Sequence, residues 1–334
     1  MFDFFTSGTN IFLLIVALVV GLILIIYGGN WFVDSSIWIA KVTHLPELLI
    51  GATIVSIGTT LPEVFVSFMS AATGETAMAV GNATGSIICN LALIFGITLC
   101  VMPTLLNRKD FISKFIFLIV AVFFLTFATL DSSIALWEGI ILILIFAAFI
   151  TLNIISALKK TATPLKDNVQ AEQPKKKQKA WVMIVLFIIG AIAIAFGANL
   201  LIDSVSALAE KAGVSTQIIS LTIVALGTSL PELITMITSV RKSNPAITMG
   251  NIIGANILNA TLVLGGSATI AGGISIPSTD FVSLLVSFAI IFTLTAILFI
   301  PILAKSKTYR WQGIAYEAIY LGYLIFLITK TLLK

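Results

Sequence analysis

The sequence predicts an all-α integral membrane protein with ten transmembrane helices, arranged as two inverted-topology repeats of five helices. Three observations support this fold class: the composition, a series of long apolar segments and an internal repeat. Of the 334 residues, 59% are apolar and 10% are charged, and the mean hydropathy is +1.12. A soluble domain is ~45–50% apolar and ~25% charged, so the composition excludes a single soluble core, a disordered chain and a nucleic-acid-binding protein.

Long apolar runs, separated by polar or Gly/Pro clusters, define the predicted helices because about 20 apolar residues span a bilayer. The first run follows a segment that holds Asp3 but no Lys or Arg, which is the wrong flank for a cleaved signal peptide, so we count it as a span. The ten predicted spans are residues 11–32, 45–72, 76–101, 112–130, 134–157, 181–203, 214–240, 245–271, 281–304 and 311–333.

The basic residues predict the orientation of these spans. If both termini lie outside, 16 of the 19 Lys and Arg residues fall on the inner side, and only Lys211, Lys330 and Lys334 remain outside. This asymmetry agrees with the positive-inside rule, by which short cytoplasmic segments are rich in Lys and Arg. The compact plan without a targeting segment favours the plasma membrane of a prokaryote.

The longest polar stretch, residues 159–180, divides the chain. It contains two prolines and a run of three lysines, and it predicts a cytoplasmic basic linker. On this division, residues 1–158 form the first five-helix repeat and residues 181–334 form the second. No protein partner is implied by either half, and the lipid bilayer is the expected surrounding.

A shift of 169 residues superimposes the two halves without a gap from residue 34 to residue 96. The best window pairs GATIVSIGTTLPE (51–63) with SLTIVALGTSLPE (220–232), which are identical at 8 of 13 positions. Chance similarity between apolar helices would match Leu and Ile, but not Gly-Thr-x-Leu-Pro-Glu. Because five spans per half is an odd number, the second half enters the membrane from the opposite side, a plan typical of secondary transporters.

Two glutamates lie in the middle of predicted spans, at matched positions of the repeat: Glu63 and Glu232. An ionisable side chain is costly there and marks an ion or substrate path. A structural hydrogen bond between helices is the alternative, which the repetition of the same residue disfavours. Each glutamate follows a proline, Pro62 or Pro231, that lacks a backbone N–H and conflicts with the carbonyl four residues earlier, so each helix is expected to kink or unwind.

Carbonyls freed by such a break are tolerated at membrane depth only where they line a cavity or meet ions or water. Thr59 lies four residues before Glu63, which places both on one helix face, and Thr228 bears the same relation to Glu232. The donors are all oxygens, which suits Ca²⁺ or Na⁺ and disfavours zinc or copper. The candidate backbone ligands are Ser56, Thr59, Ala225 and Thr228.

The next span of each half carries polar residues at a spacing of four. Amide oxygens at Asn90 and Asn259 add no charge, so the two glutamates set the site at formally −2. Glycines on the same spans allow close helix packing. The two stripes are Asn82, Ser86 and Asn90, and Asn251, Ala255 and Asn259, and the glycines are Gly81, Gly85, Gly250 and Gly254.

The motifs GTTLPE and GTSLPE, each followed by Gly-Asn and a Gly-x-x-x-x-Asn helix, resemble the two alpha-repeats of the cation/calcium exchanger superfamily, in its prokaryotic sodium/calcium exchanger branch. The resemblance implies that Glu63 and Glu232 bind calcium. It also implies that the first and sixth helices slide across the other eight. The further ligands that it implies are the carbonyls of Thr59, Thr228, Ser56 and Ala225, the hydroxyls of Thr60, Ser229 and Ser86, and the central amides of Asn90 and Asn259.

Two positions depart from the pattern of these exchangers. Ala255 stands where the prokaryotic pattern has a serine that helps to hold one sodium ion, which affects sodium number or affinity. Asn259 stands where relatives that also move potassium carry an aspartate, which argues against potassium coupling. The matched residues Asp34 and Asp203 fall near predicted span ends, where capping or exposure to solvent is expected.

The sequence therefore predicts an antiporter, not an enzyme, that exchanges Na⁺ for Ca²⁺ by alternating access without a cofactor. A proton/calcium antiporter on the same fold is the nearest alternative, and a cation channel with the same carboxylates is a further one.

Overall fold

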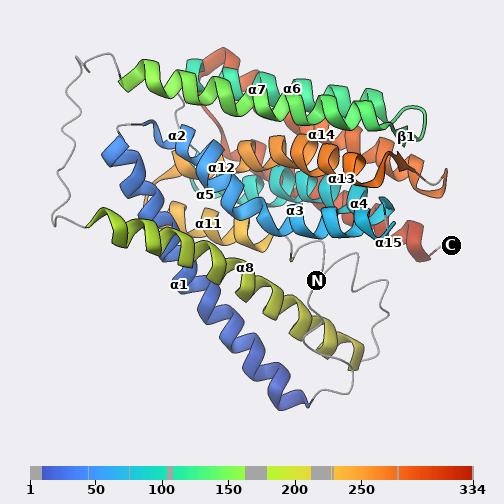
Figure 1. Ribbon diagram of the computed structural model, residues 1–334, viewed down its shortest axis with the longest axis horizontal. Helices are drawn as coiled ribbons and strands as arrows, with labels where there is room; N and C mark the ends of the chain where they lie inside the picture. Colours follow the sequence, from blue (N-terminus) through green and yellow to red (C-terminus); the bar gives the residue numbers. More distant parts are fainter. Residues whose placement is uncertain are drawn as a thin grey trace.

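The structure, a computed structural model, describes residues 10–43, 45–74, 76–103, 108–161, 179–211, 227, 229–276 and 278–332. The predicted ligands Ala225 and Thr228 and most of the predicted linker lie outside the described residues. The described chain is mostly helical, and its elements are drawn in chain order in Figure 1.

The described helices follow the order of the predicted spans. In the first half they are α1 (Ile11–Thr43), α2 (Glu47–Ile50), η1 (Gly51–Val55), α3 (Ser56–Ala72), α4 (Thr76–Ile88), η2 (Cys89–Ile94), α5 (Phe95–Val101), α6 (Arg108–Ala128) and α7 (Leu136–Thr161). In the second half they are α8 (Ala180–Lys211), α11 (Leu230–Arg241), α12 (Pro245–Leu258), η4 (Asn259–Val263), α13 (Leu264–Ala271), α14 (Ser278–Lys305) and α15 (Arg310–Leu332).

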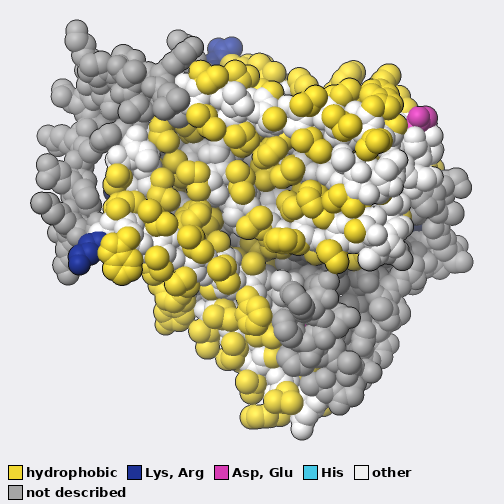
Figure 2. Space-filling view, viewed as in Figure 1, with side chains coloured by type: hydrophobic (Ala, Val, Ile, Leu, Met, Phe, Trp, Pro, Cys, Tyr) yellow, Lys and Arg dark blue, Asp and Glu magenta, His cyan; other side chains and the backbone are white. Residues whose placement is uncertain are grey.

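Eight of the described helical segments are long and apolar enough to cross a membrane. Beside them, α15 is a 23-residue helix and α11 a 12-residue one. The face shown in Figure 2 is mainly hydrophobic, and its few charged side chains lie at the margins. An apolar surface of this kind requires lipid around it, because soluble proteins do not expose such large patches. The protein is therefore a helical, multi-pass membrane protein.

Three of these segments contain a π-helical stretch, which the sequence did not predict: η1, η2 and η4. A π-helix bonds each N–H to the carbonyl five residues back, and such stretches occur mostly inside α-helices, frequently at functional sites. Two of them lie at matched positions, because η2 holds Asn90 and η4 begins at Asn259. The side chains of these residues are thus presented by locally widened helix.

The two longest helices, α1 and α8, pack against each other and cross the rest of the molecule diagonally (Figure 1). Their backbones approach closely at glycines: a methyl group at Gly21 would lie 2.9 Å from the carbonyl oxygen of Gly197, and one at Gly190 would lie 2.8 Å from that of Gly28. Both helices run eight or more residues beyond the predicted ends at 32 and 203. Asp34 therefore lies inside α1 and caps no span end, whereas the alternative expectation of exposure to solvent is confirmed, because its side chain is 58% exposed.

A two-residue ribbon joins two connections between helices, and it is the one departure from the all-α prediction in the described residues. Strand β1 (Ser133–Ile134) pairs antiparallel with β2 (Ile274–Ser275), with Ser133 opposite Ser275. The N–H of Ile276 also donates to the carbonyl oxygen of Ser132 at 2.8 Å. Strands of this length carry no alternating pattern that a sequence could reveal.

Candidate cation-binding site

Glu63 and Glu232 lie on packed helices, α3 and α11, and both side chains are completely buried. The hydroxyl of Thr60, on α3, donates to Oε1 of Glu232 at 3.2 Å and so links the two helices. The carboxylate of Glu63 is close enough to interact with the charge of Glu232, and it faces the hydroxyl of Ser86 on α4. The structure thus brings together four of the predicted site residues from three helices.

The two prolines act differently on their helices. Pro231 occupies the first turn of α11, where its missing N–H costs nothing because that group would have no helical partner. Glu232 consequently lies in the first turn, where the positive end of the helix dipole stabilises a carboxylate. In contrast, α3 remains helical through Pro62, so the expected unwinding at this proline does not occur, and the irregular stretch η1 lies before α3 instead.

The two central asparagines, Asn90 and Asn259, are both completely buried. The segment η2, which holds Asn90, packs against α11, and η4, which begins at Asn259, packs against α3. Each asparagine segment therefore contacts the helix that carries the glutamate of the other half of the chain.

The site contains an excess of buried oxygens without hydrogen-bond partners among the described residues. Both carboxylate oxygens of Glu63 are in this state, as is Oε2 of Glu232. Burying such a group without a partner costs several kcal/mol, so buried polar atoms are normally hydrogen-bonded or bind an ion. The other unpartnered groups at the site are the hydroxyls of Ser86 and Ser229 and the amides of Asn90 and Asn259. A set of oxygen donors with two carboxylates fits a hard cation.

Ser56 and Thr59 have their hydroxyls engaged within the protein. The hydroxyl of Ser56 donates to the carbonyl oxygen of Thr53 at 3.1 Å. The hydroxyl of Thr59 lies 3.4 Å from the carbonyl oxygen of Ser56 and donates to Oδ1 of Asn251 at 3.0 Å. Both residues are buried. The predicted ligand atom of Thr59 is its backbone carbonyl oxygen, which takes no part in these bonds.

Asn82 and Asn251 are involved in the site although the sequence placed them only on the polar stripes. Asn251 receives the hydrogen bond from Thr59 described above. Asn82 donates through Nδ2 to Oγ of Ser67 at 2.9 Å and to the carbonyl oxygen of Glu63 at 3.4 Å. The signal in the sequence was their matched position in the repeat, but their partners depend on how the helices pack.

The glycines of the polar stripes divide into two groups. A methyl group at Gly250 would overlap the carbonyl oxygen of Leu48, and one at Gly254 would lie 2.6 Å from the carbonyl oxygen of Ala52, so the close approach predicted for these two is confirmed. At Gly81 and Gly85 a methyl group would meet no described atom within 4 Å.

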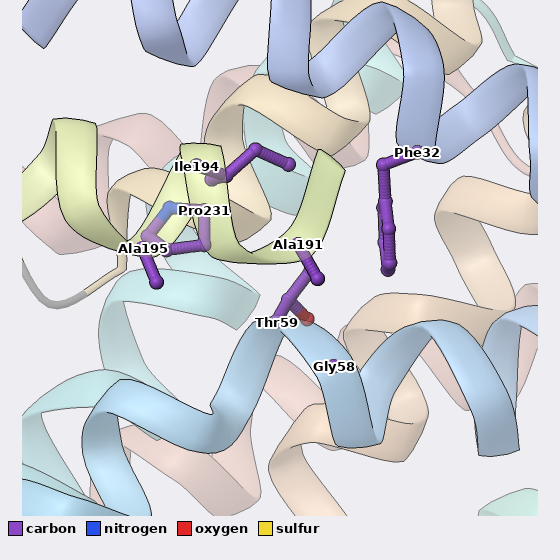
Figure 3. A pocket seen from close by; sticks show the side chains of 7 residues that line it. All are labelled: Phe32, Gly58, Thr59, Ala191, Ile194, Ala195 and Pro231. Carbon is purple, nitrogen blue, oxygen red and sulfur yellow. The ribbon is translucent and has the colours of Figure 1, made fainter. Parts of the chain in front are cut away.

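A narrow crevice lies where α3 and α11 pack against the α1–α8 pair (Figure 3). The ring of Phe32 projects into it from α1, packs on Gly58 of α3 and stacks on Phe187 of α8 at a centroid distance of 4.6 Å. The crevice also reaches Thr59, so side chains of α1 and α8 cover one side of the predicted ligand group. Its lining consists of Phe32, Gly58, Thr59, Ala191, Ile194, Ala195 and Pro231.

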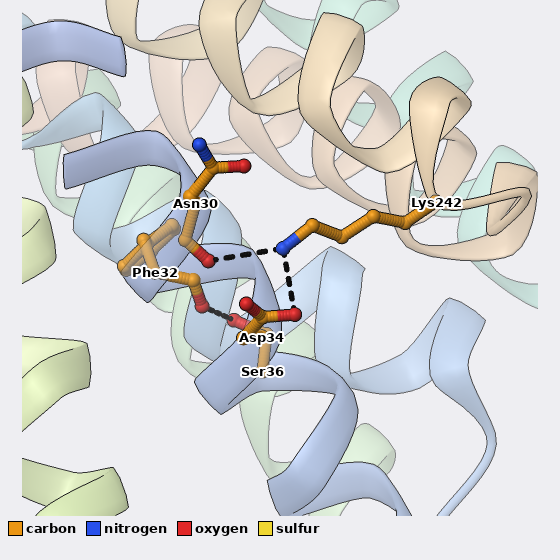
Figure 4. A network of polar contacts seen from close by, with 5 residues as sticks. All are labelled: Asn30, Phe32, Asp34, Ser36 and Lys242. Carbon is orange, nitrogen blue, oxygen red and sulfur yellow. Dashed lines mark hydrogen bonds and ion pairs between the residues drawn. The ribbon is translucent and has the colours of Figure 1, made fainter. Parts of the chain in front are cut away.

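An ion pair joins α1 to the end of α11 (Figure 4). Nζ of Lys242, the residue after α11, lies 2.6 Å from Oδ1 of Asp34 and donates to the carbonyl oxygen of Asn30 at 3.3 Å. The hydroxyl of Ser36 donates to the carbonyl oxygen of Phe32 at 2.7 Å, within the same stretch of α1. The polar stretch that suggested the end of a span thus lies inside α1, and the contacts of Lys242 connect it to the end of α11.

Comparison with known proteins agrees with this architecture. The family model described as "Sodium/calcium exchanger protein" matches residues 13–155 and 182–329. The inner membrane protein YrbG of Escherichia coli is 35% identical over 83% of this chain and 86% of its own length. The sodium/calcium exchanger MaX1 of Methanosarcina acetivorans is 28% identical over 93% of this chain and 97% of its own length.

A solved structure of the sodium-calcium exchanger NCX_Mj, soaked with 10 mM Na⁺ and zero Ca²⁺, superimposes on this chain with a TM-score of 0.78. The two are 28% identical, and the superposition covers 95% of this chain and 99% of that one. The match extends over both halves of the chain and includes the helices that carry Glu63 and Glu232. The chain therefore belongs to the sodium/calcium exchanger family.

Proposed function

We propose that the protein is an antiporter that exchanges Na⁺ for Ca²⁺ across the membrane, with Glu63 and Glu232 as the shared ligands. The observation that carries this proposal is the pair of completely buried carboxylates on packed helices, surrounded by oxygens that have no other partner in the described structure. The carbonyls of Thr59 and, by the repeat, Thr228 complete the calcium site. No covalent chemistry takes place, and Na⁺ and Ca²⁺ are the transported ions.

The charge of the site explains how the two ions are coupled. Two glutamates give −2, which one Ca²⁺ or two Na⁺ ions neutralise. Moving an uncompensated charge through the membrane interior is costly. The empty carrier therefore does not change between its outward-facing and inward-facing states, whereas the loaded carrier does. A third Na⁺ would leave the carrier positive and make exchange sensitive to the membrane potential. The sodium ligands are the carbonyls of Ser56 and Ala225, the hydroxyls of Thr60, Ser229 and Ser86, and the amides of Asn90 and Asn259.

We also propose ten spans in two inverted repeats, 1–158 and 181–334, with the linker 159–180 in the cytoplasm and both termini outside. The arrangement of the ends supports this topology. In Figure 1 the end of α7 and the start of α8 lie at the left, whereas β1 and the C-terminus lie at the right. The β1–β2 ribbon joins two connections that the topology places on the same outer side. A prokaryotic plasma membrane fits this plan.

Alternating access would require α1 and α8 to move together across the other helices, as the family resemblance implies. Their glycine contacts support movement as one unit, since the two backbones touch at Gly21 and Gly197 and again at Gly28 and Gly190. The crevice at Phe32 lies where the α1–α8 pair meets the ion site. A shift of this pair would therefore cover or uncover the ion site. The ion pair between Asp34 and Lys242 would hold the present position of α1 relative to α11.

We expect removal of the ion pair between Asp34 and Lys242 to change the equilibrium between the outward-facing and inward-facing states. The side chains of Lys242 and Asp34 are 24% and 58% exposed, so the pair contributes at most about 1 kcal/mol, or roughly a fivefold change in an equilibrium. Asp34→Asn and Lys242→Gln should each change the maximal uptake rate by up to about fivefold, and the double variant should change it no further. Initial rates at saturating Ca²⁺ measure this. Additive effects would show that the two residues act independently.

Radioactive calcium uptake into proteoliposomes tests the proposed function. Vesicles loaded with sodium and diluted into sodium-free buffer should accumulate calcium, and vesicles loaded with potassium should not. Uptake that requires internal sodium would also show that the hydroxyl missing at Ala255 is dispensable. Uptake driven only by a pH gradient in sodium-free buffer would overturn sodium coupling and favour the proton/calcium antiporter. The observation that favours this alternative is the absence, at Ala255, of the serine hydroxyl that helps to hold one sodium ion.

A further inference from the structure

Two asparagines that are related by the 169-residue repeat both bond to one helix. Asn82 on α4 donates to Oγ of Ser67 and to the carbonyl oxygen of Glu63, and Asn251 on α12 accepts from the hydroxyl of Thr59. Thr59, Glu63 and Ser67 are spaced by four residues, so they lie on one face of α3. Helix α3 is therefore held over two consecutive turns by amides from two different helices.

The position of Asn251 depends on an unusually close helix crossing. Gly250 meets η1 so closely that a methyl group there would lie 3.0 Å from the Cα atom of Gly51. A methyl group at Gly254 would lie 2.5 Å from Oγ of Ser56. At this separation the short side chain of Asn251, between the two glycines, reaches Thr59. The asparagine is 1% exposed, so the bond is shielded from water.

The segment that these amides hold contains a gap in the backbone hydrogen bonding of α3. Pro62 supplies no N–H, so the helix lacks the hydrogen bond to the carbonyl of Gly58, between the two turns concerned. Ion ligands must be held to within about 0.5 Å of the productive geometry, which requires support by neighbouring groups. A side-chain bond on either side of the proline supplies such support. One bond holds the Thr59 end and the other holds the Glu63 and Ser67 end.

We propose that Asn251 and Asn82 are positioning residues for the ion site, which fix the carbonyl of Thr59 and the backbone of Glu63 without binding the ion themselves. This inference rests on the proposed function, in which the carbonyl of Thr59 and the carboxylate of Glu63 are calcium ligands. It follows that loss of the Asn251 bond should weaken calcium binding more than it slows the exchange of bound ions.

Asn251→Leu tests the inference, since leucine has a similar size but accepts no hydrogen bond. The expected result in proteoliposomes is an increase of roughly tenfold in the calcium KM, with the maximal rate within about twofold of the unmodified protein. A tenfold change corresponds to about 1.4 kcal/mol, the size of one buried hydrogen bond. The matched control is Asn153→Leu on α7, whose buried amide donates within its own helix to the carbonyl oxygen of Phe149 at 2.7 Å; its calcium KM should not change.

A double-variant cycle separates positioning from general damage to α12. Thr59→Val removes the donor of the same bond and also the hydroxyl that faces the carboxylate of Glu232, so it should raise the calcium KM at least as much as Asn251→Leu does, and the combined variant should raise it no further than Thr59→Val alone. An unchanged calcium KM in Asn251→Leu, or fully multiplicative effects in the combined variant, would overturn the inference while sodium-driven uptake by the unmodified protein still supported the proposed function. If the unmodified protein showed no such uptake, the proposed function itself would fail.

Discussion

Glu63→Gln and Glu232→Gln should each reduce sodium-dependent calcium uptake to the background of protein-free vesicles, a loss of at least about 100-fold. Each substitution keeps the size of the side chain but lowers the charge of the site from −2 to −1, so Ca²⁺ is bound with an uncompensated positive charge in a buried place. Losing one partner of a buried charge interaction typically costs 3–5 kcal/mol, which is a factor of several hundred or more. Initial rates of calcium uptake from sodium-loaded proteoliposomes provide the measurement.

The matched control is Glu317→Gln on α15, because this carboxylate also lies within a long helix but outside the site. Its Oε1 atom packs against Gly96 of α5 and has no hydrogen-bond partner among the described residues. We expect its uptake to stay within about twofold of the unmodified protein. Normal exchange in Glu63→Gln or Glu232→Gln, at normal protein yield, would refute the assignment of the ion site.

The asymmetry between the two glutamates allows a finer result. Glu232 lies in the first turn of α11 and accepts a hydrogen bond from Thr60, whereas Glu63 lies inside α3 with both carboxylate oxygens unpartnered in the described structure. In Glu232→Gln the amide can still accept the bond from Thr60. The helix dipole at that position continues to favour negative charge, but it no longer has a carboxylate to stabilise. Both variants should be inactive, yet Glu63→Gln, which removes a buried charge without partners in the described structure, should retain more of the unfolding temperature of the unmodified protein than Glu232→Gln.

Much of the site could be predicted from the sequence because ionisable residues in apolar spans are rare and costly. That cost made Glu63 and Glu232 stand out, and their matched positions in the repeat indicated that they belong together. Ser86 and Thr60 could be added from the family resemblance, and the structure places both beside the glutamates. The positions of Ala225 and Thr228 stay predictions, because they lie outside the described residues.

Other features depend on contacts between distant segments, which the local sequence does not encode. The length of α1 was underestimated because Asn30 and Asp34 look like the end of an apolar run, whereas Lys242, 208 residues after Asp34, supplies their partner. For Pro62 the sequence predicted a kink or unwinding. Unwinding does not occur, because α3 is helical through Pro62, and the contacts of this segment with Asn82 and α12 come from distant parts of the chain.

The crossing of α12 over η1 should be the most sensitive packing position in the described structure. Gly250→Ala adds a methyl group that would overlap the carbonyl oxygen of Leu48 and lie 2.8 Å from the backbone nitrogen of Ala52. Backbone atoms cannot rotate away, so the helices must separate, and overpacking of this kind costs about 3 kcal/mol or more. We expect a clear fall in the unfolding temperature of the detergent-solubilised protein, together with loss of calcium uptake.

The loss of uptake follows from the same separation, because Asn251 reaches Thr59 only while Gly250 stays in contact with η1. Gly322→Ala on α15 is the matched control: a methyl group there meets no described atom within 4 Å. An exposed helical Gly→Ala change should leave stability unchanged or raise it by up to about 1 kcal/mol. Gly51→Ala, on the other side of the crossing, should reproduce the effect of Gly250→Ala, since its methyl group would overlap the carbonyl oxygen of Ile247. A Gly250→Ala protein with normal unfolding temperature and uptake would mean that the two backbones are not in contact, and the positioning of Thr59 by Asn251 would lose its structural basis.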